Sequence, residues 1–288
     1  MHRLDQAIER EGENWLLYYI RARVEHEAGD VAAAHADLQE AQRLGYAEAD
    51  PTFDIGGFDA AHKLAILTSL AFGTRIAAEA IDIEGIERVT LADIDAAAEL
   101  GYRIKLLGVA QRTVDGVEQR VHPTMVSKKS AIAQVMGVSN AVTIDADAVH
   151  ELTLVGPGAG GDATASAVVA DIADIAKGVR SAPFGLPTAK LAELTRTPMR
   201  RHEGGYYIRM SARDIAGAFA KIATRMAERR ISLESIVQRG KRGAPGDCVD
   251  VILITHATSE HLVREALDLI YQDGVIVSRA QVIRIERE

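Results

Sequence analysis

The sequence predicts an α+β fold in which a mixed sheet covered by helices is followed by a C-terminal βαββαβ unit. Three patterns lead to this prediction. Apolar and small residues recur at helical spacing over residues 1–45, short apolar runs alternate with helical segments over residues 82–155, and the pattern restarts after residue 205. The first pattern predicts a short N-terminal helical hairpin, and the other two predict the mixed sheet and the βαββαβ unit.

The composition is that of an ordinary globular protein, and it argues against several functional classes. Hydrophobic residues make up 48% and charged residues 26% of the 288 residues, and the formal net charge is −8. This charge argues against nucleic acid or anionic lipid as a partner. The single cysteine, Cys248, excludes an internal disulfide framework and a thiolate metal cluster. The sequence shows neither a membrane span nor a signal peptide, so we expect a cytoplasmic location.

Residues 1–45 are expected to form two helices separated by a break at residues 27–30. Asp30 is a suitable N-cap for the second helix, and Gly45 is a suitable C-terminal stop. This segment resembles a tetratricopeptide hairpin. The positions at which that repeat has its characteristic residues are roughly those of Trp15, Ala22, Gly29 and Ala34. One such hairpin cannot bury its own apolar face, so we expect it to dock on the rest of the chain.

Residues 46–180 are expected to form the domain that carries the candidate site. A polar loop at 46–57 precedes a long helix of small residues at about 59–72, and a second helical segment covers 91–101. Strand-like runs occupy 103–113, 141–146 and 152–156, and a glycine-rich turn at 156–161 opens an apolar helix. Residues 181–204 contain three of the seven prolines without a sustained period, which predicts a linker or a covering segment.

The βαββαβ unit is expected to occupy residues 205–288. Its strands are predicted at 206–212, 232–240, 248–257 and 277–286, and its two helices at 217–230 and 258–272.

Five charged residues lie before the helix predicted at 59–72 or in its first turns, and they are Glu48, Asp50, Asp54, Asp59 and Lys63. Asp59 and Lys63 are four residues apart and therefore share one helix face. One interpretation is a surface ion pair worth only about 0.3–0.5 kcal/mol. The residues around the pair are so apolar that a polar cavity is the competing interpretation. In such a cavity the ammonium could deliver a proton while carboxylates hold a substrate amine.

Two glycine-containing turns are further candidates. Gly156, Gly158 and Gly161 fit the spacing G-x-G-x-x-G between a strand and a helix, which suits a phosphate, although a tight structural turn is the alternative. The acidic residue expected about 20 positions later in a dinucleotide-binding fold is missing. In the segment 211–217, Gly217 could leave backbone N–H groups free for a carboxylate ligand, or the segment could be a plain strand-to-helix connection. His62 has no second ligand at metal-binding spacing, so we expect a structural histidine and no metal site.

Several segments resemble the homoserine dehydrogenase family in the family's own order. They are EAQRLGYAEADPTFDIGGFDAAHKLAILTSLAFG (40–73), LGYRIKLLG (100–108), GVSNAV (137–142) and GPGAGGDATASAVVADI (156–172). The segment from residue 206 to 240 resembles the ACT regulatory domain that many members append. We expect the family's N-terminal nucleotide-binding Rossmann domain to be missing, because no G-x-G-x-x-G precedes Lys63.

The resemblance implies NAD- or NADP-dependent interconversion of L-aspartate 4-semialdehyde and L-homoserine, in threonine and methionine biosynthesis. It assigns Lys63 as the catalytic proton donor, Glu48 and Asp59 as substrate-binding residues, and Asp54 as their support. The positions at which the family approaches the cofactor are Gly45, Gly156, Gly158 and Gly160.

The ACT resemblance implies control by an amino acid such as L-threonine, with Asp214 and Gly217 as effector-binding candidates, and a homodimer. Without that nucleotide-binding domain, we expect the activity of this chain alone to be impaired. The alternative is a non-catalytic regulatory protein that binds an amino acid through its ACT domain.

Overall fold

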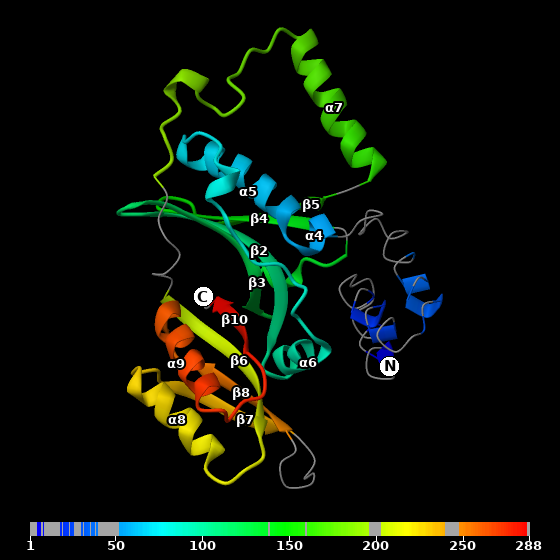
Figure 1. The fold of residues 1–288 in the computed structure, drawn as a ribbon. Coiled ribbons are helices and arrows are strands. Elements are labelled where there is room, and N and C mark those ends of the chain that lie inside the picture. The colour runs from blue at the N-terminus through cyan, green and yellow to red at the C-terminus, as the bar shows by residue number, and fades with distance from the viewer. Residues whose placement is uncertain are drawn as a thin grey trace.

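The computed structural model describes residues 52–137, 139–158, 160–195, 203–239 and 248–286, together with scattered helical residues between 5 and 39. It has the α+β fold that the sequence predicts (Figure 1). The strands of the large sheet are β1 (Asp82–Ile83), β2 (Tyr102–Thr113), β3 (Gly116–Ser127), β6 (Glu203–Arg213), β7 (Leu233–Arg239), β8 (Cys248–Thr255), β9 (Thr258–Ser259) and β10 (Gln281–Glu286). Their order is β1-β3-β10-β6-β8-β7, with β2 paired to β3 and β9 paired to β6.

A separate antiparallel hairpin consists of β4 (Ser139–Ala146) and β5 (His150–Pro157). The helices are α4 (Thr52–Ile55), α5 (Phe58–Phe72), α6 (Leu91–Glu99), α7 (Gly161–Ala176), α8 (Ala218–Glu228) and α9 (Glu260–Gln272). Three short 3₁₀ turns are η1 (Ala78–Ala80), η2 (Ile132–Gln134) and η3 (Thr188–Lys190). The helices expected at 59–72 and 91–101, and the strands expected at 103–113, 141–146 and 152–156, are therefore confirmed.

The C-terminal unit has the predicted βαββαβ order, and the alternation of β6 explains its two faces. Tyr206, Ile208 and Met210 point to one face and are buried with residues of α8 and α9 in the largest core cluster. Tyr207 points to the opposite face, where it packs with Ala96 of α6. Since side chains of a strand alternate with period two, a strand that is buried on both faces lies between two layers of helix.

The large sheet continues from the C-terminal unit into the middle of the chain. Strand β10 pairs antiparallel with β6 and parallel with β3, with Arg284 opposite Thr124 in the second pairing. Strand β3 therefore pairs both with β2 in the middle of the chain and with β10 in the C-terminal unit. The domain boundaries given above stay a prediction.

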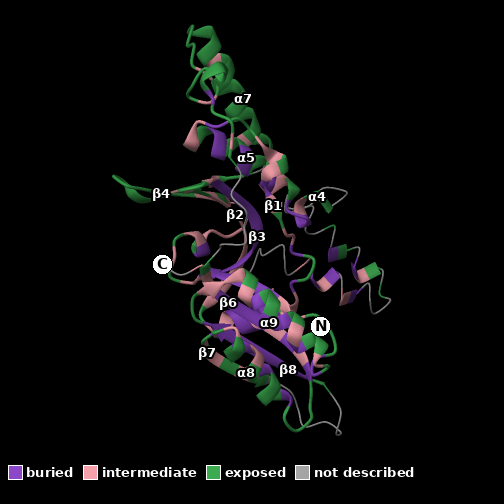
Figure 2. Cartoon of the chain, turned by 60° about the vertical axis from the view of Figure 1, so that its left-hand side comes forward, coloured by how far each residue is buried: buried purple, intermediate pink, exposed green. Residues whose placement is uncertain are grey.

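Strand β3 itself was not expected from the sequence. It is 12 residues long, pairs with β2 along its whole length, and is buried at nearly every position. It includes Glu118, Arg120 and His122, and charged residues in alternation do not resemble a buried strand. Figure 2 shows the contrast with α7, which is exposed along its length and contributes no buried residue.

Among the described N-terminal residues, helical residues lie on both sides of the expected break. The backbone N–H of Ala33 donates to Oδ1 of Asp30 at 3.1 Å, which confirms Asp30 as an N-cap. Arg21 joins the two helical segments through ion pairs with Asp5 at 2.8 Å and Asp37 at 2.5 Å.

The expected linker is described up to residue 195, and part of it is bonded to the body of the protein. Ala192 forms an isolated bridge with Thr74, and the N–H of Val117 donates to the carbonyl of Thr195 at 3.0 Å. Within the described ranges, no helix has both the length and the apolar character needed to cross a membrane.

Candidate active site

The turn between α4 and α5 positions the charged residues of the candidate site. Gly57 caps α5 with φ of 81°, a conformation that favours glycine. A side chain on Gly57 would lie 3.1 Å from Val121 and 3.3 Å from Ile83, so this turn lies directly against the strands β3 and β1. The N–H of Ile86 donates to the carbonyl of Ile55 at 2.9 Å and fixes the turn from the other side.

Asp59 and Lys63 follow this turn on one face of α5. The ammonium of Lys63 donates to Oδ2 of Asp59 at 2.6 Å, as the spacing of four predicts. The Lys63 side chain is 54% exposed and that of Asp59 is 41% exposed. The described residues therefore leave the pair open to solvent on one side and do not enclose it in the expected cavity.

Helix α5 carries apolar residues on its inner and its outer face, and the charged pair lies among the exposed ones. Its inner face buries Ala61, Leu64 and Ala65 against Val121 of β3. Its outer side exposes further large apolar residues near the pair, which are Ile66, Leu67 and Leu70. An exposed apolar stripe next to an ion pair is typical of a surface that a ligand or another part of a protein covers.

Aromatic residues lie beside the pair, and sequence reasoning did not identify them as part of the site. Phe53 of α4 stacks on Phe58 with the ring centroids 6.1 Å apart. His62 meets Phe53 edge to face at 5.4 Å. The signal in the sequence was the spacing of Phe58 and His62, which places both on the helix turn that carries Asp59.

The remaining expected residues near the pair are only partly described. Asp54 lies in α4, half-buried, and its carbonyl accepts a hydrogen bond from the N–H of Gly57 at 3.0 Å. Glu48, Asp50 and Gly45 lie outside the described residues. Among the residues that the structure describes, no group of three His, Cys, Asp or Glu side chains could hold a metal ion.

The glycine-rich turn joins β5 to α7, as expected. Gly156 and Gly160 have nothing within 4 Å of an added Cβ, so their backbones are open to a ligand. Gly160 has φ of 109° and caps α7. Gly158 differs, because an added Cβ would lie 2.1 Å from Nδ2 of Asn140. Both interpretations thus find support: the backbone is open at Gly156 and Gly160, and Asn140 approaches closely at Gly158.

The turn between β6 and α8 is open as well. Gly217 caps α8 with φ of 86°, and nothing lies within 4 Å of an added Cβ. Asp214 is exposed in the same turn. The geometry leaves room for a ligand, and the hydrogen bond from the N–H of Ala218 to the carbonyl of Ile215 at 3.2 Å orders the turn.

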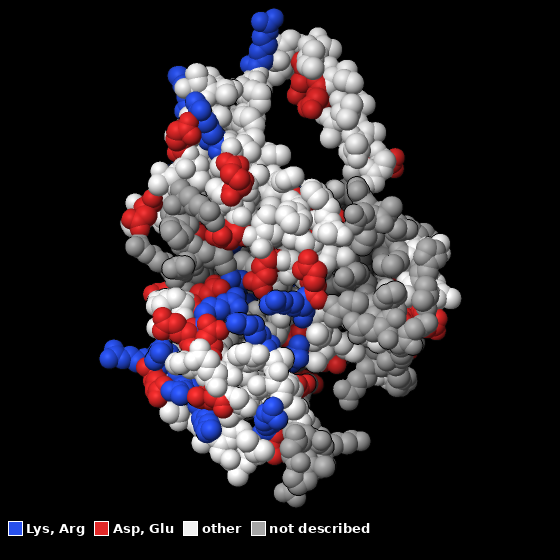
Figure 3. All heavy atoms as spheres, in the orientation of Figure 1, with Lys and Arg blue, Asp and Glu red and all other residues white. Residues whose placement is uncertain are grey.

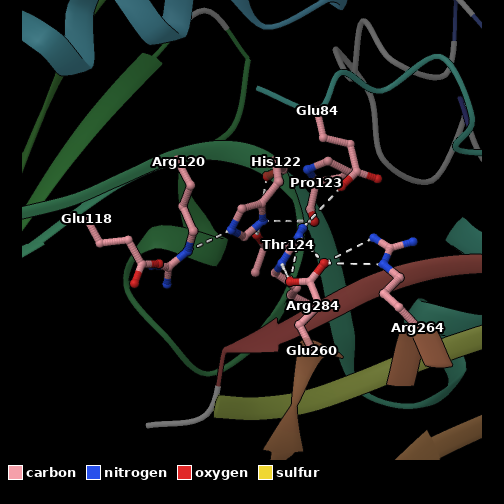
Figure 4. Close-up of polar contacts among 9 residues, drawn as sticks. All are labelled: Glu84, Glu118, Arg120, His122, Pro123, Thr124, Glu260, Arg264 and Arg284. Carbon is pink, nitrogen blue, oxygen red and sulfur yellow. Dashed lines mark hydrogen bonds and ion pairs between the residues drawn. The ribbon is translucent and has the colours of Figure 1, made fainter. Parts of the chain in front are cut away.

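A buried polar network at the junction of β3 and β10 was missed by the sequence analysis (Figure 4). Arg120 donates to Nε2 of His122 at 3.0 Å and pairs with Glu118. Because a guanidinium can only donate, Nε2 of His122 is the acceptor in this contact. Thr124 Oγ1 lies 2.8 Å from Nδ1 of the same ring. The available signal was the alternation of polar residues at 118, 120, 122 and 124, which places them on one face of a strand.

Charged side chains are unevenly distributed over the molecule. Figure 3 shows acidic and basic side chains intermixed over the C-terminal unit, whereas uncharged atoms dominate around α5 and α7. The large apolar side chains exposed on α7 include Val169, Ile172 and Ile175.

Comparison with known proteins identifies the family of the chain. The family model for homoserine dehydrogenase matches residues 14–173, and the model for the ACT domain matches residues 206–273. The first match begins within the expected N-terminal hairpin, so most of that segment lies within the family match.

Curated homoserine dehydrogenases match this chain over most of its length. The enzyme from Pseudomonas aeruginosa is 45% identical over 236 residues, which are 80% of this chain and 54% of the relative. The enzyme from Neisseria gonorrhoeae is 42% identical over 267 residues, which are 90% of this chain and 61% of the relative. The chain thus spans between about half and three-fifths of the length of these relatives.

A solved structure agrees with this result. The homoserine dehydrogenase from Thiobacillus denitrificans superposes with a TM-score of 0.78 at 42% identity, covering 88% of this chain and 58% of that one. The enzyme from S. aureus gives a TM-score of 0.64 at 30% identity. The chain therefore belongs to the homoserine dehydrogenase family and carries an ACT domain in its C-terminal part.

Proposed function

We propose that this chain provides the substrate-binding and proton-donating part of a homoserine dehydrogenase, which interconverts L-aspartate 4-semialdehyde and L-homoserine in threonine and methionine biosynthesis. The ion pair between Lys63 and Asp59 at 2.6 Å carries the proposal, since it lies in the segment that the family model matches. We also propose the predicted domain boundaries, 1–45, 46–180, 181–204 and 205–288, and a cytoplasmic location.

The proposed chemistry needs one proton and one hydride. NADPH or NADH, when bound, supplies the hydride to the carbonyl carbon of the semialdehyde. Lys63 donates its proton to the carbonyl oxygen as negative charge develops there, and the products are the alcohol and the oxidised cofactor. Asp59 directs the ammonium through the hydrogen bond that Lys63 donates to its carboxylate at 2.6 Å.

Substrate binding is assigned to Glu48 and Asp59, whose carboxylates suit the substrate's ammonium and hydroxyl groups, with Asp54 supporting the turn. The open backbones of Gly156 and Gly160 fit a nucleotide cofactor, and Gly45 and Gly158 are assigned to the same site. Gly156 and Gly160 leave room for the cofactor, because no described atom beyond their chain neighbours lies within 4 Å of a Cβ added at either position.

Regulation is assigned to the turn between β6 and α8. An amino-acid effector such as L-threonine would bind at Asp214 and Gly217, where the turn is exposed. A homodimer is part of the proposal, because the exposed apolar residues of α7 and the edge strand β7 offer surfaces for a second copy.

The experiment measures NADP⁺ reduction by L-homoserine with the wild-type chain and with Lys63→Ala. We expect Lys63→Ala to lower kcat by about 10²–10⁴-fold, which is the usual contribution of a general acid. The matched control is Lys129→Ala, which removes an exposed lysine from the loop after β3 and should leave kcat unchanged. Equal and measurable activity of Lys63→Ala and wild type would contradict the assignment. Absence of NADPH binding together with stabilisation by L-threonine would favour the non-catalytic regulatory alternative.

A further inference from the structure

We propose that Arg284, at the end of the C-terminal unit, is a positioning residue for the turn between α4 and α5, which leads into the helix of Asp59 and Lys63. This inference rests on the proposed function of that pair. It makes the βαββαβ unit a structural component of the active site, in addition to any role in binding an effector.

Arg284 is a buried cation that bridges carboxylates from two parts of the chain. Its side chain is only 3% exposed. Its Nη2 donates to Glu260 at 2.8 Å, and its Nε donates to the same carboxylate at 3.0 Å. Its Nη1 donates to Oε2 of Glu84 at 3.2 Å, which is 200 residues away in the sequence. Figure 4 shows Arg284 between the two carboxylates, with Arg264 on the far side of Glu260.

Glu84 links Arg284 to the turn between α4 and α5, because the two residues after Glu84 contact that turn directly. It directly follows β1, and its N–H donates to the carbonyl of Val121 in β3 at 2.8 Å. The next residue, Gly85, approaches the turn so closely that an added Cβ would lie 2.5 Å from the carbonyl oxygen of Ile55. The residue after that, Ile86, donates its N–H to the same carbonyl at 2.9 Å.

The turn that receives these contacts leads directly into α5. Ile55 is the last residue of α4, and Gly57 caps α5 two residues before Asp59. Gly57 also lies against Ile83, the residue before Glu84. A shift of Glu84 therefore moves the backbone that sets the direction of the first turn of α5, because close-packed glycines leave no slack between the two segments.

A second ion pair holds β10 in place beside β3. Arg120 of β3 reaches Oε1 of Glu286 in β10 at 3.5 Å. Each of the two strands thus contributes an arginine that pairs with a glutamate on the other side of the junction. This arrangement limits sliding of β10 along β3, so that Arg284 stays opposite Thr124.

If Arg284 positions this turn, a displacement within the C-terminal unit should shift the position of Lys63. Glu260 lies at the start of α9, so movement of α9 would pull Arg284 and, through it, Glu84.

The test compares Arg284→Met with Arg264→Met in the full chain, using amide hydrogen exchange read out by peptide. Arg264 is the matched control because it pairs with the same Glu260 at 3.1 Å but is 46% exposed and has no described contact with Glu84. We expect Arg284→Met to accelerate exchange at the amides of residues 55–57 and of Ile86 by about tenfold, while the strands β6 and β8 keep their protection. Arg264→Met should change neither.

Glu84→Gln provides a variant that folds even if Arg284→Met does not, because Glu84 is 33% exposed. It should accelerate exchange at the same amides, and in turnover of L-homoserine it should lower kcat more than it changes KM for the cofactor. Unchanged exchange at residues 55–57 in Glu84→Gln, or an increase spread evenly over the whole chain in that variant, would overturn the proposal. The exchange measurement needs no substrate, so its outcome is separate from that of the Lys63→Ala assay.

Discussion

Arg209 of β6 makes a two-pronged ion pair with the fully buried carboxylate of Asp93, the third residue of α6. Nε of Arg209 lies 2.6 Å from Oδ1, and Nη2 lies 3.0 Å from Oδ2. The same carboxylate accepts hydrogen bonds from the Tyr207 hydroxyl at 3.0 Å and from the N–H of Thr90 at 2.9 Å. The hydrogen bonds to Asp93 raise the pKa of the Arg209 guanidinium above its usual value. One side chain therefore caps α6 and anchors the C-terminal unit.

Replacing Asp93 should destabilise the protein strongly. Asp93→Ala leaves Arg209 half-buried without its carboxylate and removes the capping box of α6. Breaking a buried ion pair from one side costs about 3–5 kcal/mol. Urea unfolding followed by circular dichroism measures the loss. Asp95→Ala, two residues further along the same helix, is the control and should change the free energy of unfolding by less than about 1 kcal/mol. Similar losses for the two variants would refute the anchoring role of Asp93.

Asp59→Asn should separate activity from stability. The ion pair with Lys63 is exposed and four residues apart on a helix, so its loss should cost only about 0.3–0.5 kcal/mol. If Asp59 also binds the substrate, KM for L-homoserine should rise by about tenfold or more, the effect of losing one charged hydrogen bond. Steady-state kinetics and thermal unfolding of the same preparation measure the two quantities. A drop in unfolding temperature without a change in KM would assign Asp59 a purely structural role.

The sequence predicted those elements whose signals are local. Helix α5, the strands β2, β4 and β5, and every helix and strand expected in the C-terminal unit follow from periodicity within short windows. The pairing of Asp59 with Lys63 is local in the same sense, since helical geometry alone brings residues four apart together.

The features that were missed depend on contacts between distant segments. Strand β3 is buried although it contains Glu118, Arg120 and His122, because β10 and the side chains of β3 itself satisfy those charges. The contact of Arg284 with Glu84 joins residues 200 positions apart. A short window of sequence does not include the distant partner of a charged residue, so its charged residues suggest an exposed segment.

Gly158→Ala should damage the glycine-rich turn through Asn140 and not through backbone strain. An added Cβ would lie within 2.1–2.6 Å of the atoms of the Asn140 side-chain amide. Asn140 is exposed, so its amide can rotate away at a cost of about 0.5–1.5 kcal/mol, which is that of an off-rotamer side chain. Thermal unfolding should therefore show a loss for Gly158→Ala that Asn140→Ala restores in the double variant.

Gly156→Ala is the control for this prediction, because nothing lies within 4 Å of its added Cβ. It should leave the unfolding temperature nearly unchanged. NADPH binding by the double variant then distinguishes the two roles of Gly158. Restored stability with weak NADPH binding would mean that the cofactor also needs the bare backbone at this position, whereas failure of Asn140→Ala to restore stability would contradict the steric explanation.

The ion pair that joins the ends of α8 and α9 should make stability depend on pH in the acid range. Nε and Nη2 of Arg225 lie 2.7 and 2.8 Å from the two carboxylate oxygens of Asp273. This hydrogen bonding lowers the pKa of Asp273 in the folded protein. A carboxyl whose pKa is lower in the folded state stabilises the protein above its unfolded pKa of about 3.9, and this contribution is lost as the pH falls through the folded pKa. Asp273→Asn should therefore unfold at a lower temperature than wild type at pH 7, and the difference should shrink below about pH 4. Calorimetry over this pH range measures the difference in unfolding temperature.

The control repeats the comparison in the Arg225→Met background, where the cause of the lowered pKa is gone. Asp273→Asn should then add no comparable dependence of stability on pH. An undiminished dependence there would show that another group sets the pKa of Asp273.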